Sequence, residues 1–257
     1  MPTIDKALGL LDHFSSSAPE IGLAKFCKLS GFDKGTVHRY LSTLRNCGYV
    51  DQNPLNKAYR LGPAFIRLAA VREQTVPLEK VVAPLLDTLA EQTHELVHAA
   101  LALRTGMSAL YVKDGGQVGT RVGFDEAEIL PFHATSSGLA FLAFGPDEYL
   151  HSITKGTLPS FTDLTADTAE IVHSLVSKTR KTGYAYSDQS YEAEVCSVAM
   201  PFFDTTGVAI GTVAVATPRS RMKRKALVKT LAQTSLQLTH NLGGTVQDEL
   251  SRKWNSL

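Results

Sequence analysis

The chain has few cysteines, and they do not follow the spacing found in disulfide-stabilised or zinc-binding proteins. Its 257 residues include only Cys27, Cys47 and Cys196. No C-x-x-C pair occurs, and an odd number argues against a disulfide framework. Because 44 % of the residues are hydrophobic, we expect a globular fold that is stabilised by an ample core.

Long apolar runs are also missing. No stretch approaches the ~20 apolar residues that span a bilayer. The first residues, MPTIDKALGLLDHF, carry acids and lack the apolar segment of a signal peptide. We therefore expect a cytoplasmic protein with no membrane partner.

The sequence contains none of the common catalytic or cofactor motifs. The eight histidines are scattered, and there is no H-E-x-x-H, no G-x-S-x-G and no glycine-rich phosphate loop. His94 and His98 have the i, i+4 spacing of helical metal ligands, but His98 lies in a predicted strand. The sequence therefore predicts no catalytic residue, no metal and no cofactor. An enzyme that acts on a small molecule remains an alternative.

Positive charge is concentrated at one end of the chain. Residues 1–75 hold ten Lys and Arg against six Asp and Glu, a net charge of +4. Residues 76–257 hold sixteen against nineteen, a net charge of −3. A basic head on a mildly acidic body fits a nucleic-acid contact at that end, although chance often produces an excess of this size.

Apolar spacing predicts three helices in the first 47 residues, spanning Ile4 to Phe14, Ile21 to Leu29 and Lys34 to Cys47. Ser30-Gly31-Phe32 is a tight turn between the last two helices. Asp33 can cap the third helix by accepting a hydrogen bond from a free backbone N–H. Two helices joined by a short turn containing glycine form a helix-turn-helix, whose second helix contacts DNA bases.

The third predicted helix has an apolar face and a polar face. Its apolar residues recur at i, i+3, i+4 and i+7, as in a helix packed against a core. The opposite side, here called the recognition face, presents small or basic donors suited to phosphates and base edges. We expect the following residues to contact DNA: Lys34, Gly35, Thr36, His38, Arg39 and Ser42.

A β-hairpin is predicted next, from two short strands at Tyr49–Val50 and Tyr59–Leu61. Such a hairpin would be the wing of a winged helix-turn-helix, from which Lys57 and Arg60 can reach DNA. A three-helix bundle that binds a protein partner is the alternative for this segment.

The rest of the chain predicts a linker and a larger domain. A linker helix is expected from Pro63 to Arg72, and another helix from Val81 to Gln92. Strands are then expected at 96–103, 107–114, 117–123, 196–203 and 208–217, with helices at 136–144, 147–153, 166–182 and from 222 to the end. This pattern indicates an α+β sandwich. We divide the chain into a winged helix-turn-helix domain (1–62), a linker helix (63–76) and a larger α+β domain (77–257).

Three segments of the larger domain can form a binding site, and one of them runs from Tyr184 to Pro201. Small residues from Thr135 to Gly138 open a helix, where free N–H groups and hydroxyls can bind a carboxylate. Plain capping of a core helix explains the same residues. On the last strand Thr212, Ala214 and Ala216 share one face, which leaves room for a ligand or for a closely packed helix.

The N-terminal domain and two segments of the larger domain resemble one protein family, and together they cover nearly the whole chain. TVHRYLSTL and YRLGP resemble the DNA-binding domain of the IclR family of bacterial regulators. ILPFHATSSGLAFLA and GYAYSDQSYEAEVCSVAMPFF resemble its effector domain, which implies a GAF/profilin-like α+β fold. The resemblance also implies a homo-dimer or tetramer, a palindromic double-stranded operator and a small organic acid as effector.

The resemblance implies a particular effector pocket. Carried onto this sequence, the pocket residues are Ser137, Gly138, Asp188 (with Ser187 beside it), Ser197, Ala214 and Ala216. Two departures stand out: the family's cysteine aligns with Ser197 rather than Cys196, and Glu194 stands where glycine is usual. The small apolar residues of the last strand make this pocket less polar than those for the smallest oxoacids. We therefore expect an aromatic or larger hydrophobic acid.

Overall fold

The computed structural model describes residues 3–15, 18–75, 78–116 and 119–257. The chain divides into two compact units, Met1–Pro77 and Leu78–Leu257, and each is considered by itself. The finer division at residue 62 stays a prediction. The expected fold class is confirmed, because a helix-turn-helix domain precedes an α+β domain.

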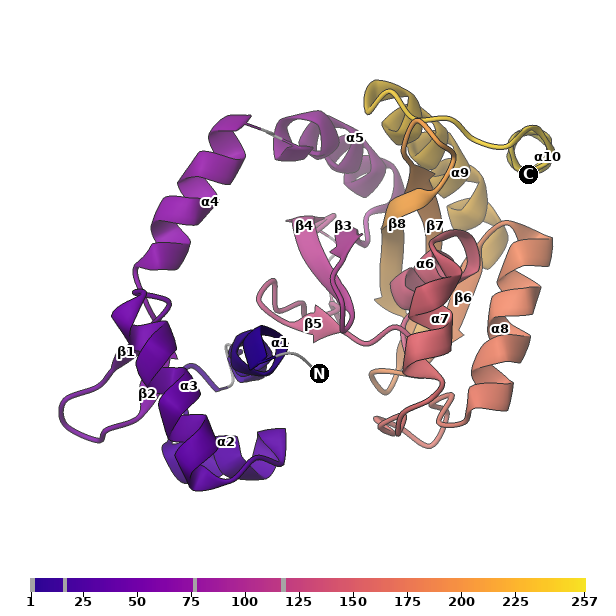
Figure 1. Cartoon of the computed structure of the whole chain (residues 1–257). Helices are drawn as coiled ribbons and strands as arrows, with labels where there is room; N and C mark the ends of the chain where they lie inside the picture. The colour runs from indigo at the N-terminus through magenta and orange to yellow at the C-terminus, as the bar shows by residue number, and fades with distance from the viewer. Residues whose placement is uncertain (1–2, 16–17, 76–77, 117–118) are drawn as a thin grey trace. The chain divides into compact units, whose positions relative to one another are not determined.

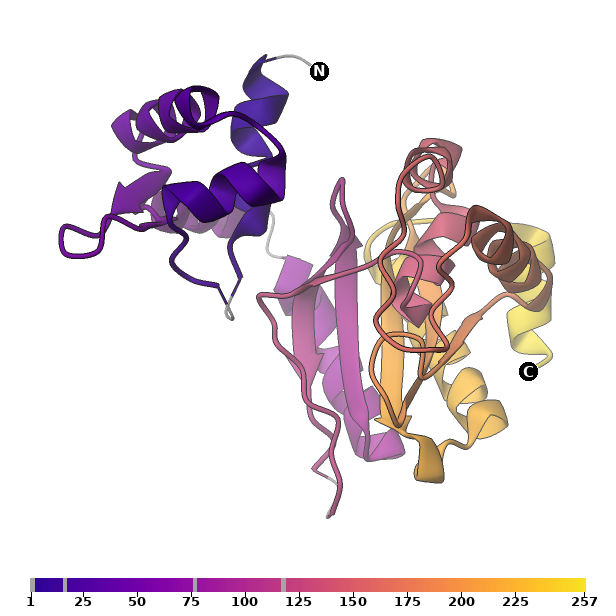
Figure 2. The same cartoon turned by 90° about the horizontal axis from the view of Figure 1, so that it is seen from below.

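The first unit holds four α-helices, a short 3-10 helix and a β-hairpin among its described residues (Figure 1; Figure 2). Their bounds are α1 Thr3–Leu8, α2 Leu23–Ser30, α3 Lys34–Asn46, β1 Val50–Gln52, β2 Tyr59–Leu61 and α4 Ala64–Thr75. The predicted first helix is too long. It ends at Leu8 and gives way to a 3-10 turn at Leu11–His13, because Gly9 is a poor helix former.

Local chemistry fixes the turn between α2 and α3. Gly31 adopts a left-handed conformation (φ 71°), which glycine reaches without steric cost, and its N–H donates to the carbonyl of Cys27. Two residues later Asp33 caps α3, as predicted, by accepting a hydrogen bond from the Thr36 N–H at 3.0 Å. Phe26, Val37 and Leu41 are fully buried below this turn. The orientation of α3 is thus set by both its cap and its core.

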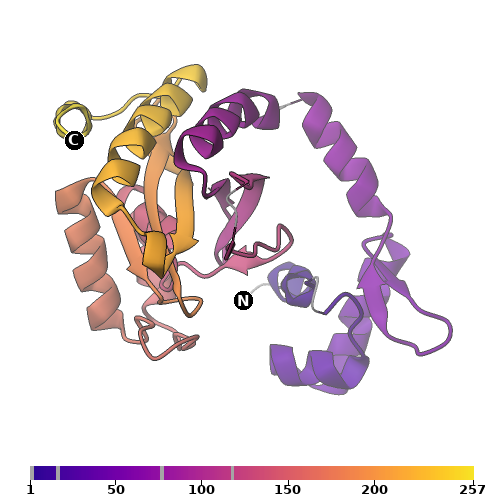
Figure 3. The same ribbon diagram turned by 180° about the vertical axis from the view of Figure 1, so that it is seen from behind.

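The second unit is built on a six-stranded antiparallel sheet with the strand order β5-β4-β3-β8-β7-β6. The strands are β3 Leu96–Ala102, β4 Met107–Lys113, β5 Ile129–Leu130, β6 Ala185–Asp188, β7 Val195–Phe203 and β8 Ala209–Pro218. The helices are α5 Leu78–Thr93, α6 Ser136–Phe144, α7 Asp147–Ile153, α8 Ala169–Thr182, α9 Arg224–Asn241 and α10 Asp248–Asn255. Helices α5 and α9 run side by side over one face of the sheet (Figure 3), and α6 and α8 lie on the other.

Three sequence predictions for this unit were wrong. The predicted strand at 117–123 falls partly outside the described residues, and 119–123 form no strand. Strands β5 and β6 were missed. The predicted last helix is broken into α9 and α10, because Gly243 is left-handed (φ 74°) and the backbone at Gly244 packs against the Phe203 carbonyl. A Cβ at Gly244 would lie only 1.9 Å from that oxygen.

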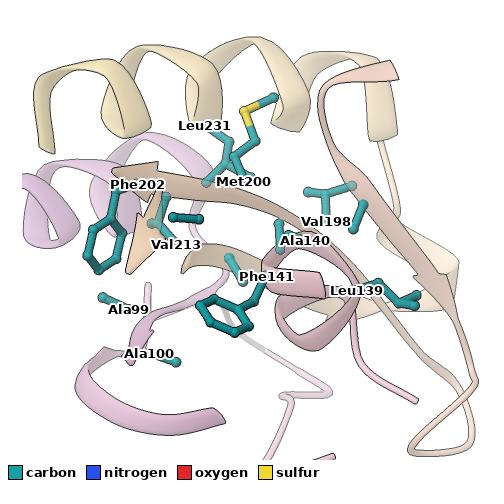
Figure 4. Packing of buried hydrophobic residues seen from close by; sticks show 14 of the residues in the cluster. Ala99, Ala100, Leu139, Ala140, Phe141, Val198, Met200, Phe202, Val213 and Leu231 are labelled. Carbon is teal, nitrogen blue, oxygen red and sulfur yellow. The ribbon is translucent and has the colours of Figure 1, made fainter. Parts of the chain in front are cut away.

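The core of the second unit lies on both faces of the sheet (Figure 4). Met200 of β7 packs toward Leu231 of α9, and Phe141 of α6 lies on the opposite face. Helix α6 is buried along its whole length except Phe144. The start of this helix therefore lies inside the domain, beside the sheet. No helix of the described residues is long and apolar enough to cross a membrane.

Candidate functional sites

The recognition face of α3 is open to solvent. Lys34, Gly35, His38 and Arg39 are exposed, and Thr36 and Ser42 are half-buried at its edge. Arg39 also lies over the ring of Tyr40, with 5.4 Å between the guanidinium carbon and the ring centroid. The structure thus brings together, on one helix, all six residues predicted to contact DNA from α3.

The hairpin between β1 and β2 holds the two other predicted DNA contacts, but in different environments. The Lys57 side chain is exposed on a left-handed residue (φ 59°). Arg60 is engaged within the unit, with Nη2 2.8 Å from Oδ2 of Asp51 and Nη1 3.9 Å from Oε1 of Glu20. The hydrogen bond from Arg60 lowers the pKa of Asp51. The Lys57 side chain is therefore more available than that of Arg60 to contact a DNA phosphate.

The second unit contains a cavity where the start of α6 faces the sheet, here called the α6 cavity. Its volume is about 80 Å³, enough for several waters or part of a small ligand. It is lined by Ser136, Ser137, Thr135, His98, Ser187, Ser197, Ala216, Val122, Gly123, Phe124, Asp125, Glu128, Leu130, Tyr191, Glu192 and Val195. Polar groups thus gather at one end of a partly apolar chamber.

Hydrogen-bond donors converge at the inner end of the α6 cavity. Thr135 caps α6 by accepting a hydrogen bond from the Gly138 N–H at 3.1 Å. The N–H groups of Ser136 and Ser137 have no acceptor among the described residues. Ser136 is 1 % exposed and donates its hydroxyl hydrogen to Ser197 Oγ at 2.7 Å. A helix N-terminus with free N–H groups is an electrostatically favourable place for an anion.

His98 forms the floor of the cavity. Its Nε2 lies 2.9 Å from Ser137 Oγ, and its ring centroid lies 4.9 Å from that of Phe124. Burial lowers the pKa of His98 to about 4, so the imidazole is neutral at pH 7. Its Nδ1 is buried and has no hydrogen-bond partner within the described part of the chain.

The mouth of the α6 cavity, formed by Glu128, Tyr191 and Glu192, is acidic. The Tyr191 hydroxyl donates a hydrogen bond to Glu128 Oε1. Burial and the negative charge of Glu128 raise the pKa of Glu192. Glu128 and Glu192 are exposed, unlike the residues at the start of α6. The interior of the cavity therefore offers hydrogen-bond donors to an anion, whereas its opening carries negative charge.

Two family models match this chain. One, described as the bacterial transcriptional regulator IclR C-terminal domain, covers residues 72–240, and the other, the IclR helix-turn-helix domain, covers residues 3–54. The chain belongs to the IclR family of bacterial transcriptional regulators. The resemblance predicted from the sequence motifs is thus confirmed.

Individual IclR relatives match along their whole length. The HTH-type transcriptional regulator XynR of Escherichia coli K12 is 29 % identical over 94 % of this chain and 97 % of its own. A solved structure of an IclR-type regulator from Silicibacter sp. TM1040 has 35 % identity and a TM-score of 0.86, covering 96 % of this chain and 99 % of that one. An IclR homologue from Microbacterium hydrocarbonoxydans, complexed with 4-hydroxybenzoate, has 20 % identity and a TM-score of 0.68 over 94 % of this chain and 99 % of that one.

The structure brings only some of the pocket residues predicted from the IclR resemblance into the α6 cavity. Ser137, Ser197 and Ala216 line it. Gly138 and Ala214 lie beside it but are covered, and a Cβ at Gly138 would be 2.3 Å from the Phe132 backbone. Close packing therefore explains why glycine is needed at 138.

Asp188 is not among the lining residues, because strand alternation points it away. Ser187 pairs in register with Ser197, and Asp188 with Cys196. On that opposite face the Cys196 thiol donates to Asp188 Oδ1 at 3.2 Å. The residue of this IclR strand that lines the cavity is therefore Ser187.

Sequence reasoning missed several lining residues. His98 was considered only as a metal ligand, and no group that could hold a metal ion is found among the described residues. Its alternation with buried Val97 and Ala99 would have placed it on the α6 face once the sheet order was known. Phe124 and Tyr191 lie outside regular strands and helices, where no periodic pattern exists to locate them.

Proposed function

We propose that this IclR-family protein binds an operator through α3 and changes its DNA binding when a small organic acid enters the α6 cavity. The observation that carries the proposal is the capped, solvent-exposed recognition face of α3. Its first turn combines Lys34 with the small residues Gly35 and Thr36, and the next turn offers His38 and Arg39. These groups match the acceptors of phosphates and of guanine edges in the major groove.

An aromatic acid is the effector class that we propose. Its carboxylate would meet the free N–H groups of Ser136 and Ser137, and its ring would lie against apolar lining from Phe124, Val195 and Ala216. The neighbour that carries 4-hydroxybenzoate has the same fold, which supports this choice. Coupling between the two sites would act through α4 and α5.

We also propose that the protein is a homo-dimer or a homo-tetramer, because two copies of the helix-turn-helix domain can bind the two half-sites of a palindromic operator. Apolar side chains on α1 and α4 support it. Ile4 is 71 % exposed, and Ile66 and Val71 are also exposed, as expected for surfaces that a second subunit covers. Such a regulator would act where the DNA is, in the cytoplasm.

The experiment is selection of genomic DNA by the full-length protein. Sheared DNA from the source genome is incubated with the protein, and the retained fragments are sequenced with and without aromatic acids. Enrichment of a short palindrome, altered by one acid, is the expected result. Retention that is lost in salt and prefers no sequence would refute the operator proposal, because such binding is purely electrostatic.

A further inference from the structure

The mouth of the α6 cavity restricts what can enter. Glu128 and Glu192 lie there, Asp125 is a third acid among the lining residues, and none of the described lining residues is a lysine or arginine. Burial raises the pKa of Glu192, and the nearby negative charge of Glu128 raises it further. A second anionic group placed at this mouth would add to the repulsion, whereas a hydrogen-bond donor would relieve it.

His98 provides a second observation at the interior of the cavity, independent of the carboxylates. It is 4 % exposed, it lines the cavity, and its Nδ1 has no partner within the described chain. Buried polar atoms without a partner are rare unless a water or a ligand meets them. His98 therefore brings to the cavity lining a buried polar atom whose hydrogen-bonding capacity the described residues leave unused.

On the basis of the proposed effector function, we infer that the cavity selects an acid with a single negative charge and a hydrogen-bond donor, such as a hydroxyl, at its other end. The carboxylate takes the inner position beside Ser136 and Ser137. The donor then reaches Glu128 and Glu192, whose charges also reject dianions. These two glutamates are the specificity-determining residues.

Three probes of the same shape separate the possibilities. Benzoate, 4-hydroxybenzoate and terephthalate share a ring and one carboxylate, and differ only in the opposite group: hydrogen, hydroxyl or a second carboxylate. Isothermal titration calorimetry with the full-length protein measures each Kd. We expect 4-hydroxybenzoate to bind about tenfold or more tightly than benzoate, and terephthalate about tenfold or more weakly than benzoate.

The double variant Glu128→Gln with Glu192→Gln tests the cause. Each amide keeps an oxygen of similar position, so the hydrogen bond from Tyr191 persists. We expect the variant to bind terephthalate about tenfold or more tightly than the wild type does. Glu91→Gln, an exposed change on α5, is the control and should leave all three values unchanged.

Equal affinity for the three probes, or unchanged ratios in the double variant, would overturn the inference and leave the proposed effector function standing. If none of the probes bound, the aromatic-acid effector itself would fail, and the inference with it. If terephthalate binding improved in the double variant but not in Glu91→Gln, the carboxylates of Glu128 and Glu192 would be shown to reject dianions.

Discussion

Nε2 of His98 lies 2.9 Å from Oγ of Ser137, so a strand of the sheet and the first turn of α6 are joined at the floor of the cavity. Both side chains are almost fully buried. A neutral imidazole suits this place, because burial disfavours the charged ring and no carboxylate of the described residues raises the pKa of His98 in return. The protonation state of His98 is therefore linked to the stability of the second unit.

The first prediction is that acid destabilises the second unit through His98. Burial lowers the pKa of His98 to about 4, whereas an unfolded histidine titrates near 6.5. Between these values the unfolded chain binds the proton and the folded chain does not, so stability is complete above pH 6.5 and falls as the pH drops toward 4. Lowering the pH from 7 to 5 should cost about 2 kcal/mol from this group.

Urea unfolding followed by Trp254 fluorescence measures this effect, because Trp254 is the only tryptophan and is buried in the second unit. His98→Gln should lose this part of the pH dependence. His173→Gln, an exposed change on α8, should keep it. Equal slopes in the wild type and His98→Gln would show that the imidazole is not buried as described.

How much of the fold follows from sequence is seen in α3 and β6. Helix α3 was predicted within one residue of its end, because its cap, apolar period and flanking glycine all agree. Strand β6 spans only four residues at the sheet edge, so its alternation is too short to detect. Glu194 shows another limit. Its backbone has φ 62°, in the left-handed region that favours glycine. This conformation explains why the IclR family usually has glycine at this position, and the sequence alone does not reveal it.

The second prediction concerns Arg39. Arg39→Ala should lower operator affinity by roughly 10- to 100-fold, since an arginine that reads a base is worth about 1–3 kcal/mol. The fold should be unaffected, because the side chain is exposed and its removal leaves the core intact. Fluorescence anisotropy with the selected operator measures the affinity. Arg104→Ala, an exposed change in the second unit, is the control, and an equal loss there would argue against the recognition face.

The third prediction separates the two cations of the hairpin by the salt dependence of operator binding. Lys57→Asn should reduce the slope of log K against log salt by about 1, because one phosphate contact is lost. Asparagine tolerates the left-handed backbone at this position, which keeps the hairpin intact. Arg60→Gln should change the slope less, because Arg60 already pairs with Asp51 and Glu20. A larger change for Arg60 than for Lys57 would reverse their assigned roles.

For the effector site, the family resemblance located α6 and β8 but not which side of β6 faces the cavity. A shift of one residue along a strand moves a side chain to the other face, so Asp188 and Ser187 exchange places with a small alignment error. Only the pairing of Ser187 with Ser197 decides between them. The loop residues of the mouth depend on tertiary packing, and no local pattern encodes it.

The fourth prediction tests whether close packing at Gly138 holds the start of α6 in place. In Gly138→Ala the new Cβ would lie 2.3 Å from Cα and O of Phe132, and backbone atoms cannot yield as a flexible side chain does. We expect a loss of about 1–3 kcal/mol or more in the free energy of unfolding, together with weaker aromatic-acid binding, because the Ser136 and Ser137 N–H groups would be displaced. Gly156→Ala is the matched control, since its Cβ would have only one neighbour, the Ile153 carbonyl, at 3.8 Å. If Gly138→Ala bound aromatic acids as tightly as the wild type, the α6 N-terminus would not be the carboxylate site.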